Sequence, residues 1–563
     1  MQVVPVTVPS WLPLQQLFLA VAVVGSLVVA RRLSSRGRWS EVLRRRFVLG
    51  VPWGTVLTVL GVLLVYWVVQ GGWSNPRNPV VIPFRSWSYF YPVGTVFAGL
   101  AHNGQGHITG NLLGTVVFAP VVEYVIGHYP RERGAESFFS VRTNPFARIL
   151  ALPAGSFVAG LFSGVFALGP VIGFSGVVFA YAGFAFVTRP LVAVFALVSE
   201  RTVGLLYRAV RNPRIVRKPT SVFVTPWWSD VAIQGHAVGI LFGAVLGIWL
   251  LRRRGERPDP LYLWFAALVY GISESLWAVY APLGGNRYAL FRAIGVGLVF
   301  AFTALVASAV TASERPLSAR VGLPRRRTAT RALVGLLVAL SAVAVPFGFT
   351  TVDGDLPADA ETVQVRDYTV TYVEGVPNQY VPSYNVSFSL FGEEYSFGSR
   401  EASGVTSSGV VVFSEQRRAW IEAVSKGRLA FQGRAVVRVG GVGWRDRVFA
   451  TRRGWSLQGN GSTYKVYLRR DGGQRRLAYR TDRVTAEPIV DGQRVAVRPN
   501  RSGFDVVVTR GNRTLGRRPV PLPGNETRVG GLTVNRTGRT LYAVNNETRV
   551  KVAKKSVPEA RQN

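Results

Sequence analysis

Long apolar segments fill the chain up to about residue 350. A helix needs about 20 mostly apolar residues to cross the hydrocarbon core of a bilayer. Seven runs approach or exceed this length, at residues 11–30, 47–70, 149–168, 231–251, 261–280, 288–310 and 332–349. Three weaker runs, at residues 108–126, 174–187 and 190–210, bring the expected number of helices to ten. The pattern predicts an all-α polytopic membrane protein in this part of the chain.

The tail beyond residue 350 has a different pattern, in which apolar and polar residues alternate as they do in half-buried strands. Gly-Asn, Asp-Gly and Pro-Gly turns separate the alternating segments. The segments are residues 362–372, 384–390, 435–439, 464–468, 495–497 and 504–508. We therefore expect residues 351–563 to form a β-rich domain.

Arginine clusters predict the orientation of the helices, because basic loops stay in the cytoplasm. The clusters at residues 31–46, 131–148, 252–257 and 315–331 follow the first, third, seventh and ninth expected helices, so all four face one side. Ten helices then place the tail outside the cytoplasm. Residues 1–10 lack the basic start of a signal peptide, so we expect the first helix to be retained. One loop conflicts with this topology because its basic residues would lie outside: Arg208, Arg211, Arg214, Arg217 and Lys218.

Seven Asn-X-Ser/Thr sequons occur in the tail, and none precedes residue 351. They begin at Asn385, Asn460, Asn500, Asn512, Asn525, Asn535 and Asn546. One interpretation is a set of glycan acceptors on an exterior surface, which agrees with the ten-helix topology. The other is that a turn-rich β domain simply contains many asparagines, serines and threonines. The sequence leaves both open.

Charge and cysteine content exclude several classes of function. The 563 residues carry a net charge of +36 and no cysteine, which rules out disulfides and thiolate metal sites. The His-Glu-x-x-His motif is absent as well, so we expect no metal and no cofactor. Much of the positive charge is loop arginine without a nucleic-acid motif, so we expect no nucleic-acid partner. Membrane lipid, or an anionic envelope polymer for the tail, is the expected attractor of this charge.

His107 and Asn111 are a candidate pair of hydrogen-bond donors. They are four residues apart, so both side chains project from one face at the outer end of their helix. At the rim of a membrane cavity, such a pair can bind the oxyanion that forms when a hydroxyl attacks a peptide carbonyl. The alternative is that both residues only satisfy loop carbonyls.

Ser175 and His236 are the candidate catalytic residues, because each begins an apolar helix and is followed by small residues. The small residues are Gly176, Ala180 and Gly183 after the serine, and Gly239, Gly243 and Gly247 after the histidine. Small residues at helical spacing let spanning helices approach closely, which would bring the imidazole within hydrogen-bond reach of the hydroxyl. Ordinary helix packing explains each set of small residues alone, but not why a serine and a histidine precede them.

These residues together resemble the rhomboid family of intramembrane serine proteases. The resemblance covers about residues 47–251 and implies a six-helix core with a Ser–His dyad that cleaves transmembrane substrates. Its motifs occur in the family's order, at the expected ends of alternating helices. They are His102-x4-His107-x3-Asn111, Gly173-x-Ser175-Gly176 and His236-x2-Gly239-x3-Gly243.

The resemblance also implies a role for each matching residue. Ser175 would be the nucleophile and His236 the general base and acid. The oxyanion binders would be His107, Asn111 and the Ser175 amide, and His102 would support them. The family commonly has a tyrosine four residues after the serine, and Phe179 stands there, which keeps a ring to stack on the histidine.

Two features depart from the family pattern. The first outer loop often carries a Trp-Arg pair in the family, whereas this loop offers Arg85-Ser86-Trp87. The helix before the core, the three helices after residue 251 and the tail also lie outside the resemblance. We accordingly divide the chain into an extra helix with a basic loop (1–46), the rhomboid-like core (47–251), three additional helices (252–350) and the β-rich extracytoplasmic domain (351–563).

Three acidic residues have expected roles outside catalysis. Asp230 lies six residues before His236 on another face, where a rim or capping role is expected. Glu123 and Glu274 lie in apolar surroundings, where we expect hydrogen bonds within the helix bundle.

The sequence thus predicts an intramembrane serine endopeptidase of the cell membrane that cuts its substrates near their outer boundary. Two alternatives stay open. One is a catalytically inactive rhomboid-like protein that binds membrane clients, and the other is a surface-anchoring protein in which the glycosylated tail carries the function.

Overall fold

A computed structural model of the chain describes most residues from Arg46 onward. The described ranges are 46–127, 139–140, 144–210, 233–277, 280–282, 288–290, 292–311, 326–354, 356, 361–379, 386–390, 393–397, 406–459, 461–481 and 488–556, with seven isolated positions before residue 46. The chain separates into two compact units. The first consists of Met1–Ala281 and Tyr288–Phe349, and the second of Pro282–Arg287 and Thr350–Asn563.

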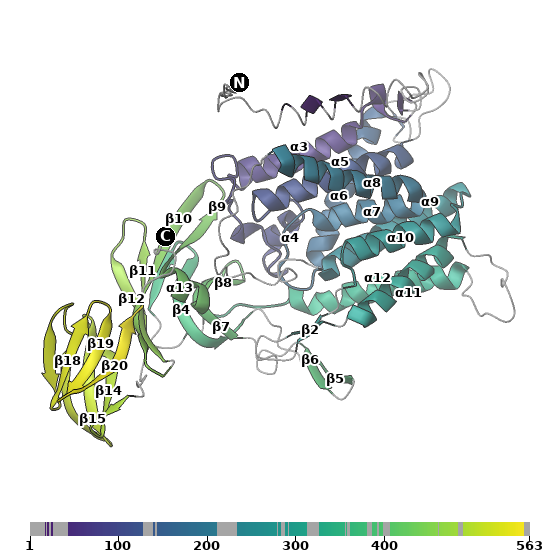
Figure 1. The fold of residues 1–563 in the computed structure, drawn as a ribbon. Coiled ribbons are helices and arrows are strands. Elements are labelled where there is room, and N and C mark those ends of the chain that lie inside the picture. The colour runs from purple at the N-terminus through teal and green to yellow at the C-terminus, as the bar shows by residue number, and fades with distance from the viewer. Residues whose placement is uncertain are drawn as a thin grey trace, which may run out of the picture. The chain divides into compact units, whose positions relative to one another are not determined.

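The first unit is a bundle of α-helices (Figure 1). In the described residues these are α3 (Trp53–Leu64, continued by a π-helical turn Val65–Val69), α4 (Pro92–Ala98), α5 (Gln105–Ile126), α6 (Pro145–Val165), α7 (Ser175–Thr188), α8 (Pro190–Val210), α9 (Ile233–Arg254), α10 (Pro260–Ser273), α11 (Arg292–Thr311) and α12 (Arg326–Gly348). Five of them are long and apolar enough to cross a membrane: α5, α6, α9, α11 and α12. Three more apolar helices are shorter, namely Trp53–Val69, α7 and α10. The expectation of a multi-pass membrane protein is supported to this extent.

Nine of the ten expected helices occur in the described residues, and the run at 11–30 lies almost entirely outside them. The expected helix over 261–280 is too long, because α10 ends at Ser273 and Ser275 follows with a φ of 58°. That left-handed conformation cannot continue a right-handed helix. Tyr280–Pro282 and Tyr288–Leu290 instead pair as the short strands β1 and β2.

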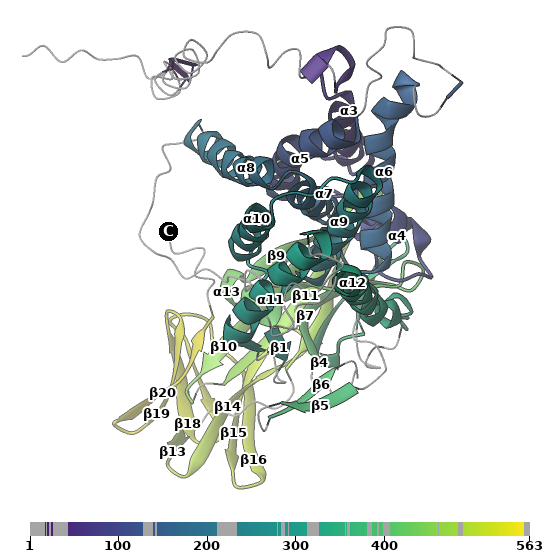
Figure 2. The ribbon, with the colours of Figure 1, turned by 90° about the vertical axis from the view of Figure 1, so that its right-hand side faces the viewer.

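Helix α7 is the buried centre of the bundle. Every residue from Gly176 to Thr188 is buried, which fits a helix that is apolar on all sides. It contacts α5, α6, α8 and α9, and Figure 2 shows it among these helices. Ser175, the residue that begins α7, is therefore held by a helix that is buried along its length.

Glu123 is a buried carboxylate on α5 that fastens the start of α3. Its Oε1 accepts a hydrogen bond from Gly54 N at 2.9 Å, and its Oε2 accepts from Thr55 N and Thr55 Oγ1, both at 2.8 Å. A negative charge at a helix N-terminus is stabilised by the helix dipole and by the free N–H groups. The expectation that Glu123 hydrogen-bonds within the bundle is confirmed.

The second unit is built from antiparallel sheets. One sheet has the order β3-β4-β7-β8, with β3 (Thr362–Val365), β4 (Tyr368–Pro377), β7 (Thr406–Ser414) and β8 (Ala419–Ser425). A second has four strands: β13 (Ile489–Val490), β14 (Gln493–Pro499), β15 (Phe504–Arg510) and β16 (Arg513–Pro519). Strands β5 (Val386–Leu390) and β6 (Glu393–Phe397) form a separate pair, and α13 (Lys426–Gln432) follows β8.

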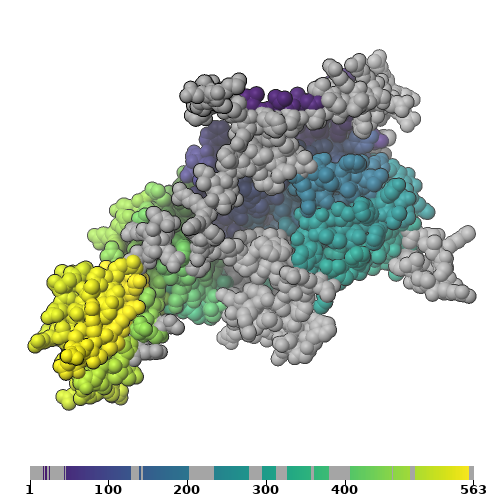
Figure 3. All heavy atoms as spheres, viewed as in Figure 1, coloured from purple at the N-terminus to yellow at the C-terminus, as the bar shows by residue number. Residues whose placement is uncertain are grey.

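The largest sheet among the described residues of the second unit has eight strands. They are β9 (Arg434–Gly441), β10 (Trp444–Leu457), β11 (Ser462–Arg470), β12 (Arg475–Arg480), β17 (Glu526–Val529), β18 (Leu532–Thr537), β19 (Thr540–Asn545) and β20 (Thr548–Lys555). The strands nearest the C-terminus, drawn in yellow, form a continuous surface in the space-filling view (Figure 3). The expected β-rich tail is present.

One expected strand is wrong in detail. Residues 362–372 do not form a single strand but the hairpin of β3 and β4, in which Val365 pairs with Tyr368. The turn between them contains Arg366 with a φ of 55°. An alternating pattern that continues through a two-residue turn hides the turn, because it keeps the period of two on both sides. The other five expected segments fall on β5, β9, β11, β14 and β15.

The sequons differ in their local structure. Asn512, Asn525 and Asn546 are exposed in turns or loops next to strands. Asn500 instead uses its side chain within its own turn, because its Oδ1 accepts from Ser502 N at 3.0 Å and its Nδ2 donates to Asp505. Asn535 lies on β18 with its Oδ1 buried. Asn385 and Asn460 lie outside the described residues.

Candidate active site

Ser175 is the first residue of α7, and a short loop leads into it. Gly173 has a φ of 133°, a conformation that favours glycine, and a Cβ there would run into the imidazole of His107. Gly173 N donates to Ala98 O at 2.8 Å, which ties the loop to the end of α4. The first N–H groups of a helix have no intrahelical partner, and the Ser175 N–H makes no hydrogen bond to any other described residue.

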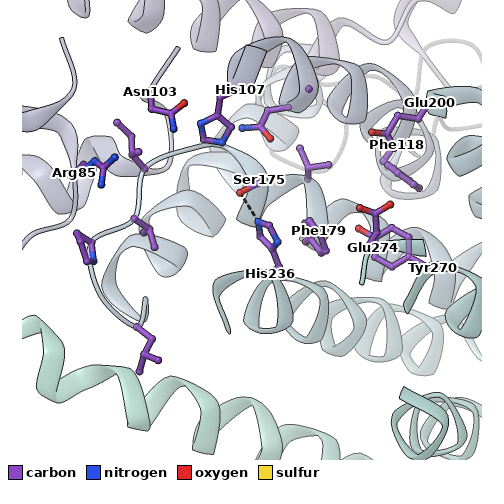
Figure 4. A pocket seen from close by; sticks show the side chains of 17 residues that line it. Arg85, Asn103, His107, Phe118, Ser175, Phe179, Glu200, His236, Tyr270 and Glu274 are labelled. Carbon is purple, nitrogen blue, oxygen red and sulfur yellow. Dashed lines mark hydrogen bonds between the residues drawn. The ribbon is translucent and has the colours of Figure 1, made fainter. Parts of the chain in front are cut away.

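The Ser175 hydroxyl and the His236 imidazole are joined by a hydrogen bond. Ser175 Oγ and His236 Nε2 are 2.9 Å apart, although the residues are 61 positions apart in sequence (Figure 4). The serine begins α7 and the histidine lies on the first turn of α9. A nucleophile within hydrogen-bond reach of a base is the arrangement that activates a hydroxyl.

Close packing of α7 against α9 brings the two groups together. A Cβ on Gly239 would overlap Gly176 O, and one on Gly243 would overlap Ala180 O. Gly183 meets the opposite helix in the same way, because a Cβ there would overlap Ile240 O. The small residues that follow Ser175 and His236 in the sequence thus lie at the contact between these helices.

The imidazole of His236 is held on its face and through its helix. Phe179 stacks on it with ring centroids 4.1 Å apart and an interplanar angle of 11°. Gln234, two residues before His236, also fixes the start of α9. Its Nε2 donates to Phe166 O and to Leu340 O, both at 2.9 Å, and its Oε1 accepts from Leu168 N at 3.0 Å. Sequence reasoning missed this tether, because its partners are backbone atoms that no motif marks.

His102 and Asn111 form a second connected pair. His102 is fully buried, and its Nε2 lies 3.0 Å from Asn111 Nδ2. The backbone of His102 is clamped by Gln70, whose Oε1 accepts from His102 N at 2.8 Å and whose Nε2 donates to His102 O at 2.7 Å. The rings of His102 and His107 meet edge to face at 5.2 Å. Gln70, which fixes this arrangement, was also missed by sequence reasoning.

A cavity of about 520 Å³ connects these groups. His107, Asn111, Ser175 and His236 all line it. Figure 4 shows His107 on the same side of the cavity as Asn103 and Arg85, with Ser175 and His236 in the middle. A peptide carbonyl in this cavity would have a nucleophile, a base and side-chain donors around it.

Acidic residues line the opposite end of the cavity. Glu200 of α8 and Glu274, the C-cap of α10, both contribute to its wall, together with Tyr270 (Figure 4). Glu274 Oε1 lies 3.7 Å from the guanidinium of Arg201. Sequence reasoning placed Glu274 in the bundle but did not connect it, or Glu200 and Tyr270, with the candidate site. The available signal was a carboxylate inside an apolar run.

In the loop before α4, Arg85 lines the cavity and its guanidinium lies 5.8 Å from the ring centroid of Trp87. Trp87 Nε1 donates to Ile82 O at 2.6 Å.

Within the described part of the chain, no group of three or more histidine, cysteine or acidic residues could hold a metal ion. Asp230 lies outside the described residues.

Comparison with known proteins does not extend these observations, since no family model, no curated protein and no solved structure matches the chain.

Proposed function

We infer that this chain is an intramembrane serine endopeptidase of the rhomboid type. The observation that carries the proposal is the 2.9 Å contact between Ser175 Oγ and His236 Nε2. It joins two helices that pack through glycines, inside a cavity of a largely apolar bundle. Polar groups are costly in such a bundle, so those that are present there usually serve a function. The order and spacing of the three rhomboid-like motifs support the same conclusion.

The proposed reaction is acyl transfer to the serine followed by hydrolysis. His236 Nε2 accepts the proton of Ser175 as Oγ forms a bond to the substrate carbonyl carbon. The carbonyl oxygen becomes an oxyanion, and as the C–N bond breaks, the imidazolium returns its proton to the leaving amine. A water molecule then attacks the acyl-enzyme, with His236 again taking and returning a proton. This hydrolysis releases the product with the new carboxyl group and regenerates the Ser175 hydroxyl and the neutral imidazole of His236.

Donors around the cavity would stabilise the oxyanion. The Ser175 N–H is free of intrahelical bonds, and His107 and Asn111 line the same cavity. Fixed donors aimed at a developing charge are usually the largest single contribution to this type of catalysis. His102 would act through Asn111, by holding the amide in place from 3.0 Å away. Phe179 would keep the imidazole of His236 facing Ser175.

We expect Asn111→Ala to lower kcat by about a hundred- to a thousandfold, the usual effect of losing one oxyanion donor. KM should change little, because the developing charge exists only in the transition state. The measurement is steady-state cleavage of a transmembrane peptide by purified protein in lipid. Thr109→Ala is the control, because its hydroxyl only donates to Gln105 O on the same helix. Unchanged turnover in Asn111→Ala would remove this residue from the site.

The proposed topology places the tail outside the cytoplasm of the cell membrane. Protease added to intact cells is therefore expected to remove the region after residue 350 and to leave the helices protected. Glycans, if the host makes them, are expected at the exposed residues Asn512, Asn525 and Asn546, rather than at Asn535 with its buried Oδ1. A tail that is digested only after lysis would contradict the ten-helix topology and the outer position of Ser175.

Single-span peptides in liposomes with the purified protein test the activity itself. We expect cleavage near the outer boundary of the peptide's span, and none with Ser175→Ala. A protein that binds such peptides equally well with Ser175 or alanine, and never cleaves them, would be the inactive client-binding protein instead. If removal of the tail abolished the cellular role while peptide cleavage persisted, the tail would carry a function of its own.

A further inference from the structure

The candidate catalytic cavity is polar at both ends and apolar between them. His107, Asn103 and Arg85 lie toward one end, and Glu200, Glu274 and Tyr270 lie at the other (Figure 4). Phe179 lies between His236 and the acidic end, and Phe118 lies beside Glu200 (Figure 4). Arg85 is the only arginine or lysine that the described residues contribute to the cavity wall. The end of the cavity that holds Glu200 and Glu274 is therefore acidic and has no basic residue in its described wall.

The two carboxylates at the acidic end are not equally paired. Glu274 lies 3.7 Å from Arg201, and Arg201 also donates to Ser273 O at 3.1 Å. Among the described residues, Glu200 has no hydrogen bond and no ion pair to any side chain. A carboxylate in apolar surroundings is expensive without a partner. Arg201 pairs with Glu274 alone, so Glu200 lines the cavity without a cationic partner among the described residues.

Tyr270 provides a second polar group at the same place. Its side chain is 2% exposed and lines the cavity, and its hydroxyl makes no hydrogen bond to the other described residues. Its ring packs edge-on against Phe179 at 5.6 Å, and Phe179 in turn stacks on His236 at 4.1 Å. A hydroxyl in a cavity wall can donate or accept a hydrogen bond to a ligand in that cavity. Here it faces the same space as the two carboxylates, where a bound cationic donor would satisfy it.

We propose that the acidic end formed by Glu200, Glu274 and Tyr270 binds the basic side chain of a lysine or arginine in the substrate, beside the bond that Ser175 cleaves. Lysine and arginine have a long apolar stem and a charged tip. The cavity has the matching order, with the ring of Phe179 next to the Ser175–His236 pair and the carboxylates beyond it (Figure 4). Glu200 and Glu274 would thus determine which transmembrane segments the protein cuts. This inference rests on the proposed protease function.

The test uses two fluorophosphonate probes that react with an active serine and differ only at the tip of one alkyl arm. One arm ends in an ammonium group and the other in a methyl group. The full-length protein in lipid nanodiscs is labelled with each probe. The readout is the labelling rate of the ammonium probe divided by that of the methyl probe. We expect this ratio to be about 10- to 100-fold higher in the natural protein than in Glu200→Gln, as is usual for a hydrogen bond to a charged group.

A matched control and a charge reversal sharpen the result. Glu256→Gln removes a carboxylate that pairs with Arg189 at 3.5 Å and does not line the cavity, so the ratio should not change. Glu200→Lys should instead favour a probe whose arm ends in a carboxylate. In the natural protein alone, the ammonium probe should react at least about tenfold faster than the carboxylate probe.

The outcomes separate this inference from the proposed function. Labelling at Ser175 with the same rate ratio in the natural protein and Glu200→Gln would overturn the basic-residue site and leave the protease proposal standing. Equal rates for the ammonium and carboxylate probes in the natural protein would overturn it as well, whether or not the variants fold. If no probe labelled Ser175 at all, the protease proposal would fail, and this inference with it.

Discussion

Replacing Ser175 by alanine is expected to lower peptide cleavage by about four to six orders of magnitude, and replacing His236 by alanine should have a similar effect. The two side chains share one hydrogen bond at 2.9 Å, so neither can act without the other. The double variant should therefore be no worse than either single variant. The rates are measured with purified protein and a transmembrane peptide in lipid.

Ser341→Ala is the matched control for these variants. Ser341 is a buried serine on α12 whose hydroxyl has no hydrogen-bond partner among the described residues. Its loss should leave cleavage near the level of the natural protein. Cleavage by Ser175→Ala at a similar level would contradict the proposed nucleophile. If the two single losses multiplied in the double variant, the serine and histidine would not be acting as a unit.

Gly239→Val is expected to reduce activity at least about a hundredfold, although it removes no functional group. A Cβ at this position would overlap Gly176 O, so the added side chain must push α9 away from α7. A displacement of about 1 Å at a catalytic group costs on the order of a hundredfold in rate. Cleavage and the thermal stability of the purified protein are measured together. We expect activity to fall more steeply than stability.

Gly335→Val on α12 is the control for added bulk. A Cβ at Gly335 would meet nothing within 4 Å, so this substitution adds the same side chain to open space. It should change neither cleavage nor stability appreciably. Full activity in Gly239→Val would show that the contact between α7 and α9 does not position His236.

Helix positions could be predicted because a spanning helix is recognised by length and composition alone. The boundaries were less accurate where local backbone geometry decides them. Helix α10 stops at Ser273 because Ser275 turns left-handed, and the segment 362–372 folds back at Arg366. Neither residue is a glycine, so the sequence carried no obvious signal for these turns.

The candidate site also contains some residues that could be selected from the sequence and others that could not. Ser175, His236 and the glycines between their helices could be selected because each lies at a helix end or at helical spacing. Gln70, Gln234 and Tyr270 could not, because their roles depend on contacts with backbone atoms or rings far away in sequence. Glu200 had a visible signal in its apolar surroundings, but only the cavity connects it with Ser175.

The most direct test of the proposed chemistry is whether a fluorophosphonate forms an adduct on Ser175. The full-length protein in lipid is treated with the alkyl probe, digested, and the modified peptide is identified by mass spectrometry. The Ser175–His236 hydrogen bond predicts a single adduct at Ser175, formed slowly or not at all in His236→Ala. No adduct at Ser175 in the natural protein, or an equal rate of labelling in His236→Ala, would contradict a Ser175–His236 catalytic pair.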